Sequence, residues 1–360
     1  MNKIDKLMLI SGVTDFAFYN YKTFPEINCY SYYKQYVQCI NNIVRYESFS
    51  QYKYRKLNFQ FINRFDVNGC AFLKNGEDYI YINEGALFKV YSTFNELVIN
   101  GAFSDYTYIK QIVNSQVYLN NEDITEQQFT FNIPTDFNAK LLAEYLSMFA
   151  MKFIVLHELG HHINGHLLYL ENQYGINILD TKLNDKKIPN LLIKTLEMDA
   201  DAFAISQLVR EFKDIILNDN ELSALPMPNE IKIGILIFSL HILFIILEEE
   251  SKSENNSDKY MPRKMRYMHN LSCLTTNLEI QYPEFLNSID FFSIASYYLK
   301  KSESLYHKVF NFDNKLINEI EEIIDAYTDF NEVKNTWNLI YDDLKKFARI
   351  PISFKYNMKN

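Results

Sequence analysis

"AKLLAEYLSMFAMKFIVLHELGHHINGHLLYL", residues 139–170, is the stretch that decides the fold. It contains no proline, its two glycines come late, and its apolar residues recur at helical spacing. We therefore predict one long helix over these residues. Four of the seven histidines in the chain lie between His157 and His166, with Glu158 among them. This concentration of imidazoles makes the helix the first candidate for a chemical site.

The composition favours one main domain with helical additions. The chain has 360 residues, of which 48% are hydrophobic, and this is enough for a sizeable core. It contains only 9 glycines and 8 prolines, so long loops are not expected. The formal net charge is −9 and the basic stretches are short, so nucleic-acid binding is not expected.

The cysteines and the apolar segments predict a soluble, cytoplasmic protein without a membrane span. The N-terminus is too polar for a secretory signal. The apolar run 233–247 is shorter than the roughly 20 residues that a bilayer span needs, so we predict a helix buried on all sides. Its His241 is interpreted as a core histidine with a hydrogen-bond partner. Four cysteines without C-x-x-C spacing are interpreted as free thiols in a reducing compartment: Cys29, Cys39, Cys70 and Cys273.

The segment before the long helix contains the clearest strand signal. Residues 1–65 have a mostly helical pattern. "DYIYINEGAL" predicts a strand over Asp78–Asn83, because aromatic and β-branched residues follow the turn residues of "KNGED". A helix over 86–99 should follow. We interpret the strand as an edge strand, and such an edge can also dock an extended peptide.

The remaining segments are mostly helical in pattern. Residues 105–123 leave two interpretations open, two short strands or a ragged helix. Residues 171–187 predict a surface loop, and a second strong helix follows over 190–216. Residues 248–259 predict a solvated linker. Residues 262–360 predict a mainly helical region that packs as a C-terminal cap.

His157 and His161 have the spacing of two metal ligands. Four residues apart on a helix, they share one face and can bind one Zn²⁺ at about 2.0–2.1 Å. Glu158 is rotated by about 100° around the axis, so it can lie beside the ion as general base for a zinc-bound water. Gly160 costs about 1 kcal/mol relative to alanine in a helix, which indicates close packing or access at that point.

The second strong helix offers the third ligand that a catalytic zinc needs. Glu197 can complete a His₂Glu site. Asp201 lies one turn further on the same face, where it can accept a hydrogen bond from the second nitrogen of a ligand histidine and so orient the ring. Asp199 lies off this face and is expected to point elsewhere.

His162 and His166 are interpreted as polar residues near the negative end of the helix dipole. His162 points about 100° away from His161. His166 lies more than two turns from His157 along the helix, too far for the same ion. One alternative stays open: a binding protein with a closed, structural metal site, in which His162 is the fourth ligand.

The two motifs together resemble a known group of peptidases. "HELGH" followed by "EMDADAFA" resembles the gluzincin metallopeptidases with an E-x-x-x-D second motif, such as the CAAX prenyl protease and its soluble relatives. The second motif is also similar to that of the ImmA/IrrE-type peptidases, and "HELGHHINGH" to the phage-exclusion Lit-type peptidases. The resemblance covers roughly residues 68–270. It implies that Glu197 binds zinc and that Asp201 supports a histidine.

One downstream stretch departs from this group. Soluble members often carry a His-Pro segment followed by an arginine. The nearest stretch here is "YMPRKMR", in which Met261 replaces the histidine and Arg266 matches the arginine. The stabiliser of the oxyanion is therefore unassigned among three candidates: Tyr260, Arg266 and His269. The multi-span membrane core of the CAAX protease is absent, so prenylated substrates are not implied.

Together these observations predict an α+β fold that is predominantly helical. We expect a helical N-terminal extension (1–65), a zincin-like metallopeptidase domain with a small β-sheet edge (66–270) and a helical C-terminal region (271–360). The predicted function is that of a cytoplasmic zinc endopeptidase acting on a protein or peptide. The resemblance to the Lit-type peptidases implies an alternative, a latent phage-defence protease that needs a phage-derived trigger. A non-catalytic, zinc-containing regulatory protein is the remaining alternative.

Overall fold

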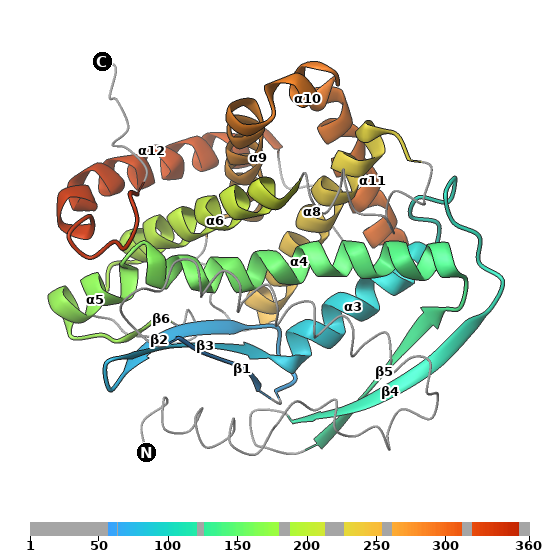
Figure 1. The fold of residues 1–360 in the computed structure, drawn as a ribbon, viewed down its shortest axis with the longest axis horizontal. Coiled ribbons are helices and arrows are strands. Elements are labelled where there is room, and N and C mark those ends of the chain that lie inside the picture. The colour runs from blue at the N-terminus through green and yellow to red at the C-terminus, as the bar shows by residue number, and fades with distance from the viewer. Residues whose placement is uncertain are drawn as a thin grey trace.

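The long central helix organises the molecule. The structure is a computed structural model that describes residues 57–62, 64–120, 126–179, 188–212, 227–253, 261–311 and 319–352. It is α+β and predominantly helical, as predicted. Helix α4 (Phe137–Ile163) lies between a small sheet and helix α6 (Asn190–Phe212), as Figure 1 shows. Helix α4 begins where the Asp136 side chain accepts hydrogen bonds from two backbone amides of the first turn.

The small sheet has the strand order β1-β3-β2-β6. Its strands are β1 (Leu57–Ile62), β2 (Gly69–Lys74), β3 (Glu77–Asn83) and β6 (Ile178–Leu179). β1 pairs parallel with β3, and the other neighbours pair antiparallel. β2 and β3 form a hairpin whose turn has φ values of 52° at Asn75 and 77° at Gly76. An Asn-Gly pair favours this turn because both residues tolerate positive φ, and the predicted turn and strand are confirmed.

β3 is not an edge strand, so the predicted docking edge at Asp78–Asn83 is wrong. Residues 78–83 pair with β1 on one side, and residues 77–82 pair with β2 on the other. The covering strand β1 lies in a stretch whose pattern was interpreted as helical. The rest of the predicted N-terminal extension, residues 1–56, lies outside the described residues.

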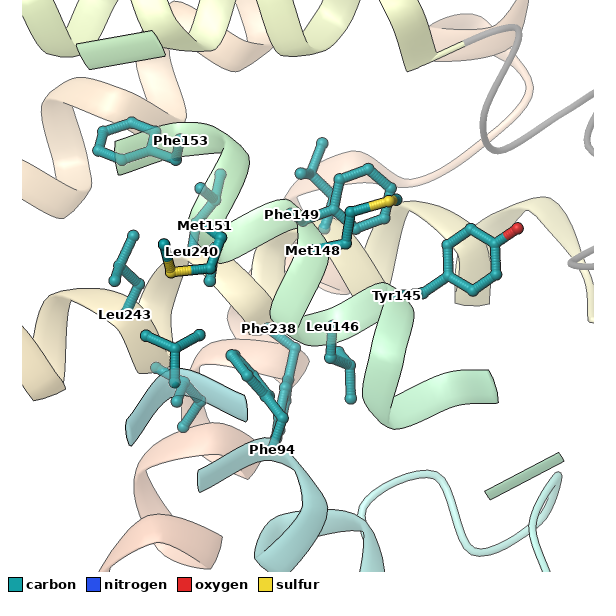
Figure 2. Packing of buried hydrophobic residues seen from close by; sticks show 14 of the residues in the cluster. Phe94, Tyr145, Leu146, Met148, Phe149, Met151, Phe153, Phe238, Leu240 and Leu243 are labelled. Carbon is teal, nitrogen blue, oxygen red and sulfur yellow. The ribbon is translucent and has the colours of Figure 1, made fainter. Parts of the chain in front are cut away.

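Helices α3 (Glu84–Ile99) and α8 (Asn229–Ser253) pack against α4 and build the main core with it. Figure 2 shows part of this packing, with labelled side chains such as Phe94 from α3, Met151 from α4 and Phe238 from α8. All three of these side chains are fully buried. The helix predicted over 86–99 is therefore confirmed and belongs to the core.

Helix α8 contains the apolar run 233–247, which was compared above with a membrane-spanning segment. By length and composition it could cross one, yet 83% of its most apolar window is buried inside the protein. Residues 233–246 are all buried, so the predicted core helix is confirmed. His241 lies within it, and its Nε2 is 3.1 Å from Glu303 Oε1, which is the partner expected of a core histidine.

The linker predicted over 248–259 is wrong at its start, because α8 continues to Ser253. The acidic side chains at its beginning are not merely solvated. Tyr306 donates a hydrogen bond of 2.6 Å to Glu249, and Lys89 lies 2.6 Å from Glu250. These contacts join the end of α8 to two other helices, which stabilises helical structure in a stretch of low apolar content. The remainder of the stretch lies outside the described residues.

A two-stranded ribbon follows α3 and precedes α4. Strands β4 (Ile112–Asn120) and β5 (Glu126–Pro134) pair antiparallel and extend along one side of the molecule (Figure 1). Of the two interpretations open for residues 105–123, the strand is therefore correct over 112–120. β5 was not predicted, although Phe131 and Ile133 alternate toward the core.

The C-terminal region is mainly helical in its described part, as predicted. It comprises α9 (Arg263–Gln281), α10 (Pro283–Asn287), α11 (Phe291–Phe310) and α12 (Glu319–Leu344). α9 and α12 both pack against α6, and α11 packs against α8. These helices therefore cover the outer sides of the two helices that flank α4.

The described cysteines are free thiols, as predicted. Cys70 is buried on β2 and Cys273 is partly buried on α9. Burial, with a smaller effect of the neighbouring aspartates, raises the pKa of the Cys273 thiol to about 12, so it is a poor nucleophile at neutral pH. Cys29 and Cys39 lie outside the described residues.

Candidate metal centre

The long helix predicted over 139–170 is interrupted by a turn. α4 ends at Ile163, and α5 (His166–Tyr174) begins after two intervening residues. Gly165 between them has a φ of +81°, which glycine adopts without the steric penalty of a side chain. A Cβ at this position would lie 2.5 Å from the backbone carbon of Phe347, so the C-terminal segment also packs against the turn.

Two side chains of α4 and one of α6 converge on one point. The ligand atoms of His157, His161 and Glu197 all lie within 4.8 Å of one another, and all three residues are buried. His157 Nε2 is 3.2 Å from Glu197 Oε2 and 3.2 Å from His161 Nε2. His161 Nε2 is 3.5 Å from Glu197 Oε1. Two imidazole nitrogens and a carboxylate thus face each other, and the group could hold a metal ion.

Gly160 allows α6 to approach α4 closely enough for this arrangement. A Cβ at Gly160 would lie 3.3 Å from the Cα of Ala200 and 3.1 Å from the ring of Phe203. The close packing predicted for this glycine is confirmed. Because Glu197 precedes Ala200 by about one turn of α6, the close approach brings its carboxylate to the two histidines.

Asp201 holds the outer nitrogen of His157. Its Oδ1 is 2.7 Å from His157 Nδ1. Arg266 donates to both carboxylate oxygens at 2.6 Å, and Asn270 donates to one of them at 3.0 Å. Burial opposes ionisation, but Arg266 and His157 keep the pKa of Asp201 well below its usual value. The carboxylate is therefore ionised and fixed in orientation.

The charges around the group favour a cation between the ligand atoms. Burial lowers the pKa of His157, but Glu197 and Asp201 outweigh it and raise the pKa to about 10. Burial and the neighbouring His157 hold the pKa of His161 well below its usual value. His161 is therefore neutral, with a lone pair available to bind a metal ion, and the negative charges of Glu197 and Asp201 act at His157.

His166 and Asp199 form a second contact chain that the sequence interpretation missed. His161 Nδ1 is 2.9 Å from His166 Nδ1, and His166 Nε2 is 2.9 Å from Asp199 Oδ2. Asn164 donates to the same oxygen at 2.6 Å. His166 and Asp199 both lie outside the metal group, as expected. The interpretation of His166 as a polar residue at the end of a continuous helix is wrong, because His166 is buried at the start of α5 and contacts His161. The Asn-Gly dipeptide at Asn164–Gly165 is a recognisable turn signal that could have indicated this.

His162 points away from the metal group and toward the sheet. Its Nε2 is 3.0 Å from the carbonyl oxygen of Tyr79, and its Nδ1 is 3.5 Å from Asp78 Oδ1. Arg349 lies 2.6 Å from the other oxygen of Asp78. Burial raises the pKa of Asp78, but His162 and Arg349 together lower it overall. This geometry excludes His162 as the fourth ligand of a closed site.

Glu158 lies between α4 and the start of β2. It is buried, and it is outside the three-residue metal group. A Cβ on Gly69 would lie 2.9 Å from Glu158 Oε1 and 3.1 Å from its Cγ. The carboxylate therefore occupies the space that a side chain at position 69 would need.

The two described candidates for oxyanion stabilisation already have partners. Arg266 binds Asp201 through Nε and Nη2 and lies over the ring of Phe244. His269 Nε2 is 3.2 Å from the carbonyl oxygen of Met198. Tyr260 lies outside the described residues. Arg266 is thus placed to orient Asp201, and none of the three is assigned to the oxyanion.

A family described as Peptidase U49 matches residues 89–279, which is more than half of the chain. The chain belongs to the Peptidase U49 family. Membership supports a peptidase, and the Peptidase U49 segment contains the whole metal group and Asp201. Neither a curated protein nor a solved structure matched the chain. The hairpin β2–β3 and helix α12, which both contact this region, lie outside the matched segment.

Proposed function

We propose that this Peptidase U49 member is a zinc endopeptidase that hydrolyses peptide bonds of a protein substrate. The observation that carries the proposal is the buried His157–His161–Glu197 group within a peptidase family segment. Two imidazoles and one carboxylate form the donor set of catalytic zinc sites, which keep a fourth position open. The division of the chain into regions 1–65, 66–270 and 271–360 remains a prediction. The cytoplasmic location also remains a prediction.

The donor set fits zinc in chemistry as well as in number. Calcium and magnesium prefer oxygen ligands throughout, whereas zinc accepts imidazole nitrogen together with carboxylate oxygen. The outer nitrogens of His157 and His161 are each held by a hydrogen-bonding partner, as in established zinc sites. When bound, Zn²⁺ supplies a Lewis acid that lowers the pKa of a coordinated water to about 7.

Glu158 is proposed as the general base. It follows His157 directly on α4, so it leaves the helix about 100° around the axis from the ligand imidazole and is expected to lie beside the metal ion rather than bind it. A carboxylate so placed takes a proton from the attacking water and returns it to the leaving amine. His157, His161 and Glu197 are proposed as ligands, and Asp201 keeps the His157 ring in one orientation.

The proposal is tested by metal analysis and by the formation of new protein termini. We expect about one zinc per purified chain. Incubation with host-cell lysate should create new N-termini that a chelator prevents and added zinc restores. If the protease is latent, the new termini should appear only in lysate from phage-infected cells. A metal-free chain that cleaves with chelator present would contradict the zinc mechanism and leave the peptidase assignment intact.

Gly69→Ala is expected to lower activity without removing the metal. The new Cβ would press on the Glu158 carboxylate and on Ile82, both of which end in movable atoms, so the fold tolerates the change. A displaced base costs roughly 10- to 100-fold in kcat, because proton transfer depends on geometry. Cys70→Ala is the matched control, since alternate residues of a strand face opposite sides. Equal kcat in Gly69→Ala and wild type would show that Gly69 does not position the base.

A further inference from the structure

We propose that His166 and Asp199 form a hydrogen-bonded relay that orients His161 and brings negative charge to the metal centre. The inference rests on the proposed function in one respect, that the His157–His161–Glu197 group binds a divalent cation. Neither residue belongs to that group, so both act through His161 as positioning residues.

The direction of each hydrogen bond in the relay follows from the ligand role of His161. Nε2 is the nitrogen that faces Glu197, and with a metal ion bound there the neutral ring carries its proton on Nδ1. That proton is donated to His166 Nδ1 at 2.9 Å. A neutral imidazole that accepts at Nδ1 carries its proton on Nε2, and His166 donates that proton to Asp199 at 2.9 Å. The chain of donors therefore ends on a carboxylate.

Burial makes the relay necessary for the ligand. His161 is 1% exposed and His166 is fully buried, so water does not replace either partner. A buried N–H that loses its acceptor costs the full desolvation of that group. Without His166, the His161 ring would lose the contact that fixes its tautomer. Asn164, which donates to the same Asp199 oxygen at 2.6 Å, holds the far end in place.

The charge on Asp199 distinguishes this relay from the contact between Asp201 and His157. Arg266 lies against both oxygens of Asp201 and neutralises its charge. In the described part of the chain, the ion-pair contact of Asp199 is with His166, and no lysine or arginine takes that place. A buried charge needs a counter-charge. Glu197 and Asp199 together therefore match the two positive charges of a divalent cation, while Asp201 is already paired.

Two substitutions separate the hydrogen bond from the charge. His166→Asn keeps an acceptor oxygen close to the position of Nδ1 but ends the connection to Asp199. Asp199→Asn keeps the shape and the acceptor but removes the charge. For the full-length chain, Zn²⁺ affinity is measured by competition with a chromophoric chelator. We expect each variant to bind Zn²⁺ roughly 10- to 100-fold more weakly than wild type.

The double variant provides the decisive comparison. If the two residues act through one chain, His166→Asn with Asp199→Asn should bind Zn²⁺ about as weakly as either single variant. If the losses of Zn²⁺ affinity in the two single variants add in the double variant, the relay is overturned. Single variants that bind Zn²⁺ like wild type would also overturn it. Asp343→Asn removes an exposed carboxylate from the end of α12 and should leave the affinity unchanged.

The test also separates the relay from the metal centre itself. A wild-type chain that binds no Zn²⁺ would overturn the proposed function and the relay with it, whereas tight binding in all variants overturns the relay alone. The absorption spectrum of bound Co²⁺ reports ligand geometry and should change in both single variants. If His166→Asn fails to fold, as judged by circular dichroism, Asp199→Asn alone decides through its Zn²⁺ affinity.

Discussion

Glu158→Gln should abolish proteolysis while the chain keeps its metal. Glutamine has the shape of glutamate but cannot accept a proton from water at neutral pH, and general-base catalysis contributes about 10²- to 10⁴-fold in rate. Glu158 is outside the His157–His161–Glu197 group, so its charge is not needed for ligation. The rate at which new N-termini form measures the loss of proteolysis, and the zinc content of the purified variant measures retention of the metal.

Glu158→Asp is a useful companion to that variant. Aspartate keeps the carboxylate but withdraws it by one methylene, so activity should fall less than in Glu158→Gln if proton transfer is the role. A Glu158→Gln enzyme with wild-type activity would remove Glu158 from the mechanism. A variant that loses its zinc would instead show that Glu158 supports the metal group.

Asp201→Ala should lower the free energy of unfolding of the chain and also lower its affinity for the metal. The substitution leaves the Arg266 guanidinium, which is 11% exposed, without its carboxylate, and it removes the acceptor of His157. Breaking one side of a buried ion pair costs about 3–5 kcal/mol, and loss of a partner behind a ligand costs about 10- to 100-fold in metal affinity. Urea unfolding of the zinc-free chain measures the first effect, and chelator competition measures the second.

Two further variants separate these effects. Asp201→Asn keeps hydrogen-bonding capacity without charge. The stability of this variant should therefore lie between those of Asp201→Ala and wild type. Asp201→Leu combined with Arg266→Met removes both charges, and the stability of the zinc-free chain should recover because no unpaired charge stays buried. Zinc affinity should not recover, since His157 still lacks its acceptor. Recovery of both quantities would contradict the assignment of Asp201 as the partner of His157.

The sequence was sufficient to bring the three proposed ligands together. His157 and His161 share a helix face by spacing alone, and Glu197 with Asp201 repeats that spacing on a second helix. The observed distances among these side chains follow from two regular helices in close contact at Gly160. Helical periodicity is a local property, so it can be inferred without knowledge of the rest of the chain.

The sequence interpretation failed where long-range pairing or one residue's backbone decides the structure. β1 is a strand because β3 is available to pair with it. The local sequence pattern of this stretch was interpreted as helical and did not indicate a strand. His166 reaches His161 because Gly165 adopts positive φ, which changes the direction of the chain within two residues. The acidic end of α8 is helical because partners from other helices contact it.

The contact between the C-terminal segment and the turn at Gly165 has a consequence for how the centre is assembled. Phe347 packs against Gly165, the Arg349 amide donates to the carbonyl of Ile163, and the Arg349 side chain reaches Asp78. All of the proposed ligands precede this segment in the chain. A chain cut before Phe347 would therefore keep every proposed ligand and lose the contacts that support the turn beside them.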